Sequence, residues 1–372
     1  MKIALVHDYL REYGGAERVV EAMHEMWPSA PLYTSFFDKE ALGEQWKRFA
    51  DWDIRTSWVQ QNWLVMKFHS PLRFFAPKIW ESFDLSGYDV VISSSGWFMC
   101  RGVTVKKSAV HICYIHHPPR NLYGYATGSN LQKYWQVRVY ATIINFFLRQ
   151  YDYNTAQKVD FFIANSEETK RRVQKFYRRD SIVIYPPIAQ GPKKARPWGT
   201  LRPGLDTGRA FFLSVGRLTY SKRVDLAIEA ANKLKIPLKI VGTGSEEKNL
   251  RALAGPTVEF LGSVSDEELA KLYSGAKALI FCALDEDFGM VPVEAEAAGT
   301  PVIALAQGGV LETVVDGKTG VLFDKPTVES LVRALGKFGK LGRLDKNCKV
   351  QAKKFSKERF QKELRKFVEA HV

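Results

Sequence analysis

Short strand-like runs alternate with helix-like segments along this chain. Before residue 186 the runs are Ile3–Val6, Val90–Ser93, Val110–Ile115, Phe161–Ala164 and Ile182–Ile184. Parallel strands need long crossover connections, usually helices, which cover the faces of the sheet. Apolar runs separated by segments of helical period therefore predict an α/β fold built on a parallel sheet.

The alternation breaks after Tyr185 and then starts again. Residues 189–208 are rich in proline, glycine and basic side chains, a composition typical of an interdomain linker. The second series of strand-like runs is Phe211–Val215, Leu238–Val241, Val258–Leu261, Leu279–Cys282 and Val302–Ala304. We therefore predict two Rossmann-like domains, residues 1–188 and 209–353. A charged amphipathic helix, residues 354–372, is expected to pack across their junction.

Two such domains form a cleft, and ligands of open parallel sheets bind beyond the carboxyl ends of the strands. The most informative motif, DEDFGMVPVEAEAAG, follows the strand-like run that ends at Cys282. Pro292 fits the first turn of a helix running to about Ala298. The amides from Phe288 to Val291 would then form a helix-start anion site, with Glu286 before it and Glu294 inside the helix. Acids beside an anion site suit a ligand that carries phosphates and hydroxyls, such as a nucleotide-sugar.

Other candidate residues also follow strands. Arg217 and Lys222, in GRLTYSKR, suit a diphosphate, although Lys222 is equally typical of a solvated helix start. Gly216, Gly242 and Gly15 lie in turns that allow a backbone to approach a ligand, and each is also typical of a purely structural turn.

The segment HHPPR follows the strand Val110–Ile115 and is expected to face the same cleft. Its imidazoles are too close in sequence to share one role, so we assign the ligand contact to His116, with a structural role as the alternative.

The formal charge of +14 calls for an anionic partner. Nucleic acid is not expected, because no recognition-helix, RNP or zinc-finger pattern occurs. Residues 63–80 interleave aromatic side chains with Lys67, Arg73 and Lys78, which is typical of a peripheral patch on anionic membrane. An amphipathic helix pair packed into the first domain explains the same pattern.

The apolar stretch Tyr140–Leu148 is far shorter than the ~20 residues that span a bilayer. The charged N-terminus does not resemble a signal peptide, which favours a cytoplasmic location. Cys100, Cys113, Cys282 and Cys348 lack disulfide or zinc spacing and are expected to be reduced.

Two other chemistries, metal binding and redox catalysis, use similar motifs. Asp285-Glu286-Asp287 resembles an Asp-x-Asp metal site, but Arg217 and Lys222 already supply positive charge. We therefore expect no metal and no other cofactor. A redox enzyme is disfavoured because GTGS after Val241 lacks the third glycine of a dinucleotide fingerprint.

Taken together, GGAE, YIHHPPR, SVGRLTYSKR, VGTGSE, FLGSVSDEEL and the run from Glu286 through GGVLETVVDGKTGVLF resemble glycosyltransferase family 4. The resemblance implies the GT-B fold and retaining transfer of a hexose from a nucleotide-diphosphate sugar without a required metal. YIHHPPR looks most like the bacterial O-antigen mannosyltransferases, which makes GDP-mannose the leading donor, with a UDP-sugar as the alternative. The implied acceptor is a lipid-linked glycan or polysaccharide.

The resemblance also implies roles for single residues. Arg217 and Lys222 would hold the diphosphate, Glu294 the ribose, and Glu286 and His116 the donor sugar. Backbone donors would come from the stretch Phe288, Gly289, Met290 and Val291. Gly15 would approach the diphosphate from the first domain. A non-catalytic nucleotide-sugar sensor would need the same pocket, and only product formation separates the two.

Overall fold

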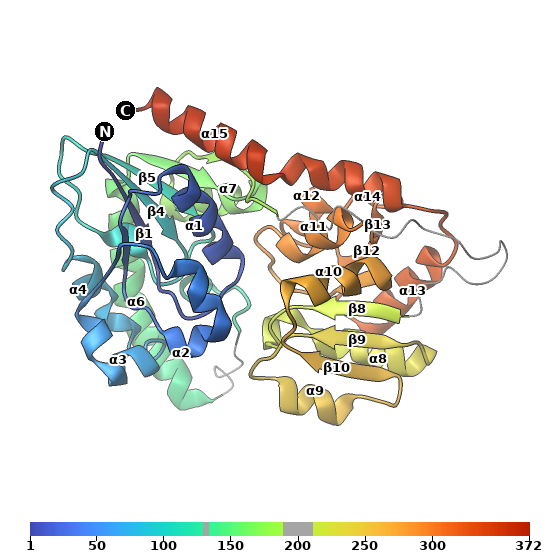
Figure 1. The fold of residues 1–372 in the computed structure, drawn as a ribbon. Coiled ribbons are helices and arrows are strands. Elements are labelled where there is room, and N and C mark those ends of the chain that lie inside the picture. The colour runs from blue at the N-terminus through green and yellow to red at the C-terminus, as the bar shows by residue number, and fades with distance from the viewer. Residues whose placement is uncertain (129–133, 189–210) are drawn as a thin grey trace. The chain divides into compact units, whose positions relative to one another are not determined.

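The computed structural model describes residues 1–128, 134–188 and 211–372. The predicted linker, residues 189–208, lies outside the described residues. The chain divides into two compact units, drawn as a ribbon in Figure 1. The first comprises residues 1–125, 133–187 and 358–372, and the second comprises residues 126–132 and 188–357.

The first unit is built on a seven-stranded sheet of order β3-β2-β1-β4-β5-β6-β7, and all of its pairings are parallel. The strands are β1 (Ile3–His7), β2 (Leu32–Thr34), β3 (Ile54–Thr56), β4 (Val90–Ser95), β5 (Val110–Ile115), β6 (Phe161–Ala164) and β7 (Ile182–Val183). The central strands β1 and β4 are buried along their whole length, as expected of apolar runs covered on both faces.

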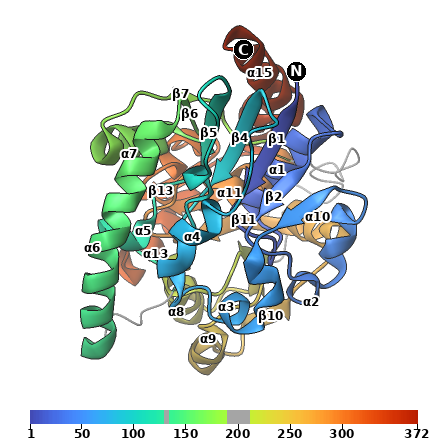
Figure 2. The same ribbon diagram turned by 90° about the vertical axis from the view of Figure 1, so that its left-hand side faces the viewer.

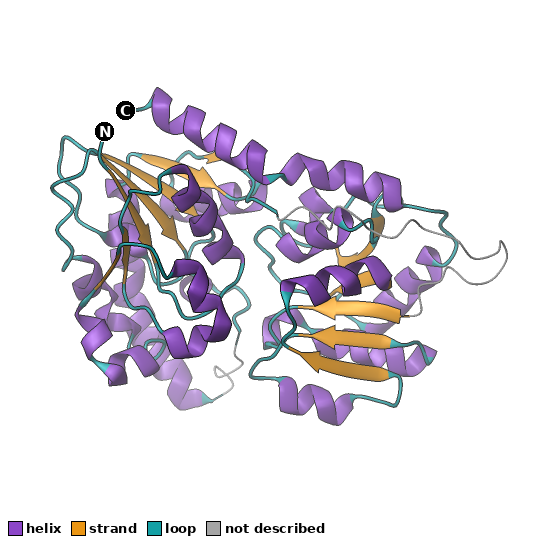
Figure 3. Ribbon diagram, viewed as in Figure 1, coloured by secondary structure: helices purple, strands orange, loops and turns teal. Residues whose placement is uncertain are grey.

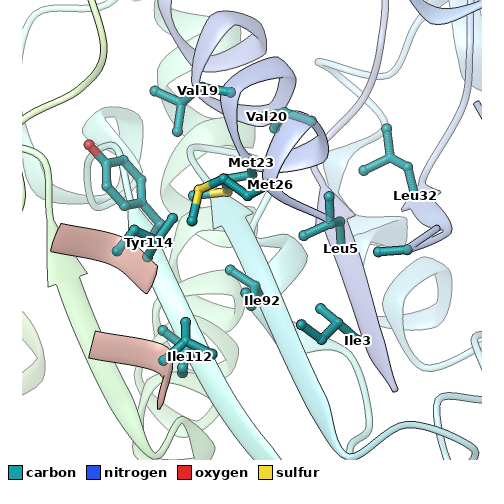
Figure 4. Close-up of a cluster of buried hydrophobic side chains, with 14 of the residues drawn as sticks. Ile3, Leu5, Val19, Val20, Met23, Met26, Leu32, Ile92, Ile112 and Tyr114 are labelled. Carbon is teal, nitrogen blue, oxygen red and sulfur yellow. The ribbon is translucent and has the colours of Figure 1, made fainter. Parts of the chain in front are cut away.

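Helices accompany this sheet in both views (Figures 1 and 2). They are α1 (Gly15–Met26), α2 (Lys39–Leu42), α3 (Trp63–Lys67), α4 (Ala76–Trp80), α5 (Arg120–Tyr123), α6 (Trp135–Lys158), α7 (Glu167–Tyr177) and α15 (Lys357–Ala370). One core lies between α1 and the sheet, where Val19 and Met23 pack over Leu5 and Ile92 (Figure 4).

The second unit carries a six-stranded sheet of order β10-β9-β8-β11-β12-β13, again entirely parallel. Its strands are β8 (Phe211–Val215), β9 (Leu238–Val241), β10 (Val258–Gly262), β11 (Ala276–Phe281), β12 (Val302–Leu305) and β13 (Gly320–Phe323). Its helices, coloured purple in Figure 3, are α8 (Val224–Leu234), α9 (Glu247–Leu253), α10 (Asp266–Gly275), α11 (Met290–Ala297), α12 (Val310–Thr313), α13 (Val328–Phe338) and α14 (Asp345–Ala352). The parallel α/β fold predicted from the alternation is confirmed.

The last helix returns to the first unit. Phe360, Leu364 and Val368 of α15 are buried in the same core as Tyr114, whose ring centroid lies 5.7 Å from that of Phe360. Phe355 precedes the helix and packs in the second unit, 5.3 Å from the ring of Phe288. Across the described residues, no helix is long and apolar enough to cross a membrane.

Candidate functional site

Glycine turns close the carboxyl ends of β8 and β9. Gly216 and Gly242 adopt φ values of 144° and 122°, in a region that favours glycine. A Cβ on Gly242 would lie 2.0 Å from the carbonyl oxygen of Gly216, so the two turns are in direct contact. Only glycine at position 242 allows this approach. Arg217 follows Gly216 and is exposed on its turn.

Lys222 and Glu286 form an ion pair in this region. Their Nζ and Oε2 atoms are 2.7 Å apart, and both side chains are largely buried. The Lys222 ammonium also lies 5.4 Å from the centroid of the Phe281 ring, at the end of β11. The backbone joins the two loops as well, because the Leu284 amide donates to the Ser221 carbonyl over 2.8 Å. A cation and a carboxylate are thus held together beyond two neighbouring strands.

The predicted helix start after Glu286 is present as the N-terminus of α11. Gly289 caps the helix with φ of 91°, and the helix begins at Met290 and continues through Val291. Phe288 is buried. The predicted end at Ala298 lies one residue beyond the observed last residue, Ala297.

A second glycine pair supports this loop, and the sequence analysis had assigned it no role. The Gly309 amide donates to the Glu286 carbonyl over 2.9 Å. A Cβ on Gly308 would lie 2.2 Å from that carbonyl oxygen, and one on Gly309 would lie 2.3 Å from the Asp287 carbonyl oxygen. Gly308 and Gly309 therefore allow the backbone that presents Glu286 to rest directly on a neighbouring turn.

Glu294 lies inside α11 and is half-buried. Its Oε2 accepts a 2.9 Å hydrogen bond from the hydroxyl of Tyr273 on α10, and the Tyr273 side chain is itself buried. This bond fixes one carboxylate oxygen. Sequence reasoning missed Tyr273, because its position in an ordinary amphipathic helix carries no signal.

The acidic triplet divides into separate structural roles. Asp285 has φ of 51° and accepts hydrogen bonds from the Ala126 amide, over 2.8 Å, and from the Gln307 side chain, over 3.0 Å. Asp285 thus anchors the loop, while Glu286 pairs with Lys222. Among the described residues, no three His, Cys, Asp or Glu side chains cluster as metal ligands would.

In the first unit, Gly15 is the first residue of α1. Neither it nor Gly14 has a positive φ. The Gly14 amide donates to Oε2 of Glu17 over 2.8 Å, which caps the helix start.

His116 follows β5, and only 8% of its surface is exposed. Its Nε2 lies 2.7 Å from the Ser94 hydroxyl, so this nitrogen points into the unit. His117, next along the chain, is more exposed. The structure therefore assigns His116 one buried partner, and this leaves its predicted sugar contact untested.

A hydrogen-bonded chain leads from His116 back to the glycine loop. Ser94 also lies 3.3 Å from Nδ1 of His7, and Nε2 of His7 is 3.3 Å from Oε1 of Glu17. Burial lowers the pKa of His7, but the hydrogen bond and charge of Glu17 outweigh it, so that the pKa is raised. Nothing in the sequence indicates this series of hydrogen bonds, because its residues come from three separate segments.

Comparisons with known proteins identify the family. Residues 13–189 match the family model described as Glycosyltransferase Family 4, and residues 202–355 match that described as Glycosyl transferases group 1. The two ranges together span most of the chain. The chain belongs to glycosyltransferase family 4.

Relatives of this family 4 chain include two named D-inositol 3-phosphate glycosyltransferase. That of Nocardioides sp. is 30% identical over 198 residues, which cover 45% of this chain and 43% of the relative. That of Streptomyces griseus is 31% identical over 217 residues, covering 48% of this chain and 46% of the relative. The matches thus span about half the length of the curated relatives, and these names do not include the predicted O-antigen mannosyltransferases.

Solved structures show the same fold. Anabaena HepE in complex with UDP and glucose has a TM-score of 0.70 at 18% identity, and the comparison covers 100% of both chains. The lipopolysaccharide outer core galactosyltransferase WaaB, in its apo form, has a TM-score of 0.68 at 18% identity, again over 100% of both chains. The predicted GT-B fold is confirmed.

Proposed function

We propose that this protein is a retaining glycosyltransferase that moves a hexose from a nucleotide-diphosphate sugar to a lipid-linked or polysaccharide acceptor. The observation that carries the proposal is the Lys222–Glu286 pair, held beside the touching glycine turns of Gly216 and Gly242. These groups supply a cation, a carboxylate and close backbone approach at the strand ends where ligands of parallel sheets bind.

The proposed chemistry uses the charges of the second unit. Lys222 and Arg217 bind the diphosphate and stabilise the negative charge that develops as the bond between sugar carbon and phosphate oxygen breaks. The acceptor hydroxyl attacks from the face that the diphosphate leaves, and its proton passes to the departing phosphate oxygen. Neither a protein nucleophile nor a metal is part of the proposal.

Donor entry requires the Lys222–Glu286 pair to rearrange. With its ammonium drawn to the diphosphate, Lys222 releases Glu286 to accept hydrogen bonds from the hydroxyls of the donor sugar. Glu294 binds the ribose with the carboxylate oxygen that Tyr273 does not hold. Backbone amides at the start of α11, from Phe288 to Val291, add donors for phosphate.

GDP-mannose remains our leading donor, and a UDP-sugar is the second candidate. HepE, which shares the fold, was also solved with UDP-glucose, and that structure has a TM-score of 0.69 against this chain. For the acceptor, the relatives named for D-inositol 3-phosphate make a phosphorylated polyol worth testing beside lipid-linked glycans.

Binding is tested first with a thermal-shift panel of GDP-, UDP-, ADP- and dTDP-sugars. A donor at a hundred times its dissociation constant stabilises the folded protein by about 2.7 kcal/mol. A response confined to GDP-mannose supports the leading donor, and a response confined to UDP-sugars supports the alternative.

Turnover is then measured with the labelled donor that binds. Lys222→Ala and Glu294→Ala should each remove most turnover while leaving the circular dichroism spectrum unchanged. Lys271→Ala is the matched control, because Lys271 is exposed on α10 and pairs with Glu267 at the surface. Near-full turnover in both site variants would show that the site is assigned wrongly. Donor binding without any product would instead favour the sensor.

The proposed location is the cytoplasm, at the inner face of the cell membrane. All four cysteines are buried, and no disulfide joins them in the described residues, which fits a reducing compartment.

A further inference from the structure

The long helix α6 is apolar on two opposite faces. Its inner face includes Ala141 and Leu148, which are buried. The outer face carries large apolar side chains one helical turn apart, from Trp135, which is 63% exposed, to Phe147, which is 62% exposed. The outer residues are Trp135, Val139, Ile143, Phe146 and Phe147. An apolar stripe of this length on a water-facing helix indicates an interaction surface.

A neighbouring segment carries exposed apolar side chains as well. The hydroxyl of Tyr140, on α6, donates to the carbonyl of Pro71, and Arg73 donates to the side chain of Asn145 over 2.9 Å. These contacts hold α6 beside the segment of α3 and α4, which lies next to it in Figure 2. That segment adds four exposed apolar side chains, Trp63, Leu64, Phe68 and Phe74. We call these side chains and the outer residues of α6 the α3–α6 face.

The charge of this surface has one sign. Residues 62–80 and 134–158 contain a single acid, Asp152, which is buried and paired with Arg101. Exposed cations in the same ranges include Lys67, Lys78, Arg138 and Arg149. Lys67 lies over the aromatic rings, with its Nζ 5.9 Å from the centroid of Trp63 and 5.8 Å from that of Phe68.

Apolar rings interspersed with lysine and arginine fit one partner best. Protein interfaces are depleted of lysine. Interfacial membrane helices combine tryptophan and phenylalanine with basic side chains, because the rings enter the acyl boundary while the cations meet anionic headgroups.

We propose that the α3–α6 face docks on a bilayer surface that carries anionic lipid. The rings of Trp135, Phe147 and Trp63 enter the headgroup region, and the surrounding cations lie at phosphate level. This inference extends the proposed function by bringing the enzyme to the membrane that holds a lipid-linked acceptor, but docking itself needs neither donor nor acceptor.

The test is sedimentation of the full chain with vesicles, of phosphatidylcholine alone or of an equimolar mixture with phosphatidylglycerol. We expect binding to the mixed vesicles that weakens as salt is raised, and far weaker binding to neutral vesicles. The double variant Ile143→Ser/Phe147→Ser should bind mixed vesicles at least about tenfold more weakly. The matched control is Leu311→Ser/Val350→Ser, two similarly exposed apolar residues of the second unit, and it should bind as the unaltered chain does.

A second measurement locates the contact. Vesicles with brominated acyl chains should quench the tryptophan fluorescence of the unaltered chain, and Trp135→Phe should reduce the quenched fraction. Unchanged thermal unfolding of each variant would show that the fold is intact.

Several results would overturn docking. One is no sedimentation with mixed vesicles, and another is an equal loss of vesicle binding in the test and control variants. A third is a dimer in analytical ultracentrifugation that is lost only in Ile143→Ser/Phe147→Ser. The last would make this face a contact between copies of the chain. The vesicle experiments contain no nucleotide-sugar, so a failure to bind vesicles leaves the glycosyltransferase proposal standing. Loss of turnover in the site variants likewise leaves membrane docking standing.

Discussion

A buried acid beside the candidate donor site is expected to make the stability of the protein depend on pH. Glu296 lies two residues after Glu294 on α11, and its side chain is 0% exposed. Among the described residues, neither carboxyl oxygen has a hydrogen-bond partner of good geometry. Burial raises the pKa of Glu296 to about 8, and the Thr319 hydroxyl and the Lys354 ammonium oppose the shift without cancelling it.

The direction of this pH dependence follows from comparing Glu296 in the folded and unfolded chain. The ordinary pKa of 4.5 applies to the unfolded chain, so below that value both states are protonated and Glu296 costs nothing. As the pH rises, the unfolded state ionises while the folded state keeps its proton, and the folded state loses relative stability until the pH passes about 8. Linkage puts this loss at about 1 kcal/mol at pH 5 and about 4 kcal/mol at pH 8. Local relaxation on ionisation makes these values upper bounds.

The variant Glu296→Gln removes the titration and keeps the shape. We expect it to unfold at higher urea than the unaltered chain, with a free-energy advantage that grows by about 3 kcal/mol between pH 5 and pH 8. Glu229→Gln, at an exposed position on α8, is the matched control and should show no such trend. Comparing variants cancels the titration of all other groups.

Circular dichroism follows unfolding of the whole chain, and hydrogen exchange of peptides from α11 reads the second unit alone. The second measurement matters because two units can unfold separately. An advantage of Glu296→Gln that stays constant with pH would refute the reasoning, since a merely structural gain does not titrate.

Three further predictions rest on single contacts. Gly242→Ala should destabilise the second unit by about 2 kcal/mol or more in urea unfolding, because its Cβ would overlap the Gly216 carbonyl at a strained φ. Gly336→Ala, where a Cβ meets nothing within 4 Å, should be neutral or stabilising, and equal losses would contradict the argument. Arg101→Met should cost about 3–5 kcal/mol, because it leaves Asp152 buried and unpaired; a cost near zero would show that water reaches the pair. Tyr273→Phe should raise the KM for the donor about fivefold with little change in kcat, since it frees one oxygen of Glu294, and an unchanged KM would remove Tyr273 from the site.

Periodicity predicted the fold because each strand is a local run of apolar residues. The runs Val110–Ile115, Phe161–Ala164, Phe211–Val215 and Leu238–Val241 match the observed strands residue for residue. The short strands β2, β3 and β13 were missed: β2 and β3 have only three residues each, too few to carry a periodic signal, and β13 begins at a glycine, Gly320. Within the predicted segment 354–372, Phe360, Leu364 and Val368 are buried in a core of the first unit and Phe355 contacts Phe288 of the second, and its packing across the junction stays a prediction.

The predictions for the site were limited by contacts between distant segments. Glu286 and Lys222 were chosen separately, and nothing in the sequence states that they pair across 64 positions. The Asp285 contact to Ala126 spans 159 positions, so the anchoring role of that acid could not be read from the triplet. Glu296 was missed for another reason, because helical period alone does not say that a charged residue faces inward.

The contacts at Asp285 explain why an acidic triplet suits this loop. Asp285 holds a left-handed backbone conformation through two hydrogen bonds, and Gly309 fixes the carbonyl of the next residue. With its backbone fixed on both sides, Glu286 cannot move far, so in the proposed mechanism it is Lys222 that exchanges partners when a diphosphate enters. A loop free to follow Lys222 would keep the ion pair intact and compete with the ligand. The rigidity given by Asp285 therefore favours donor binding, although Asp285 need not touch the donor.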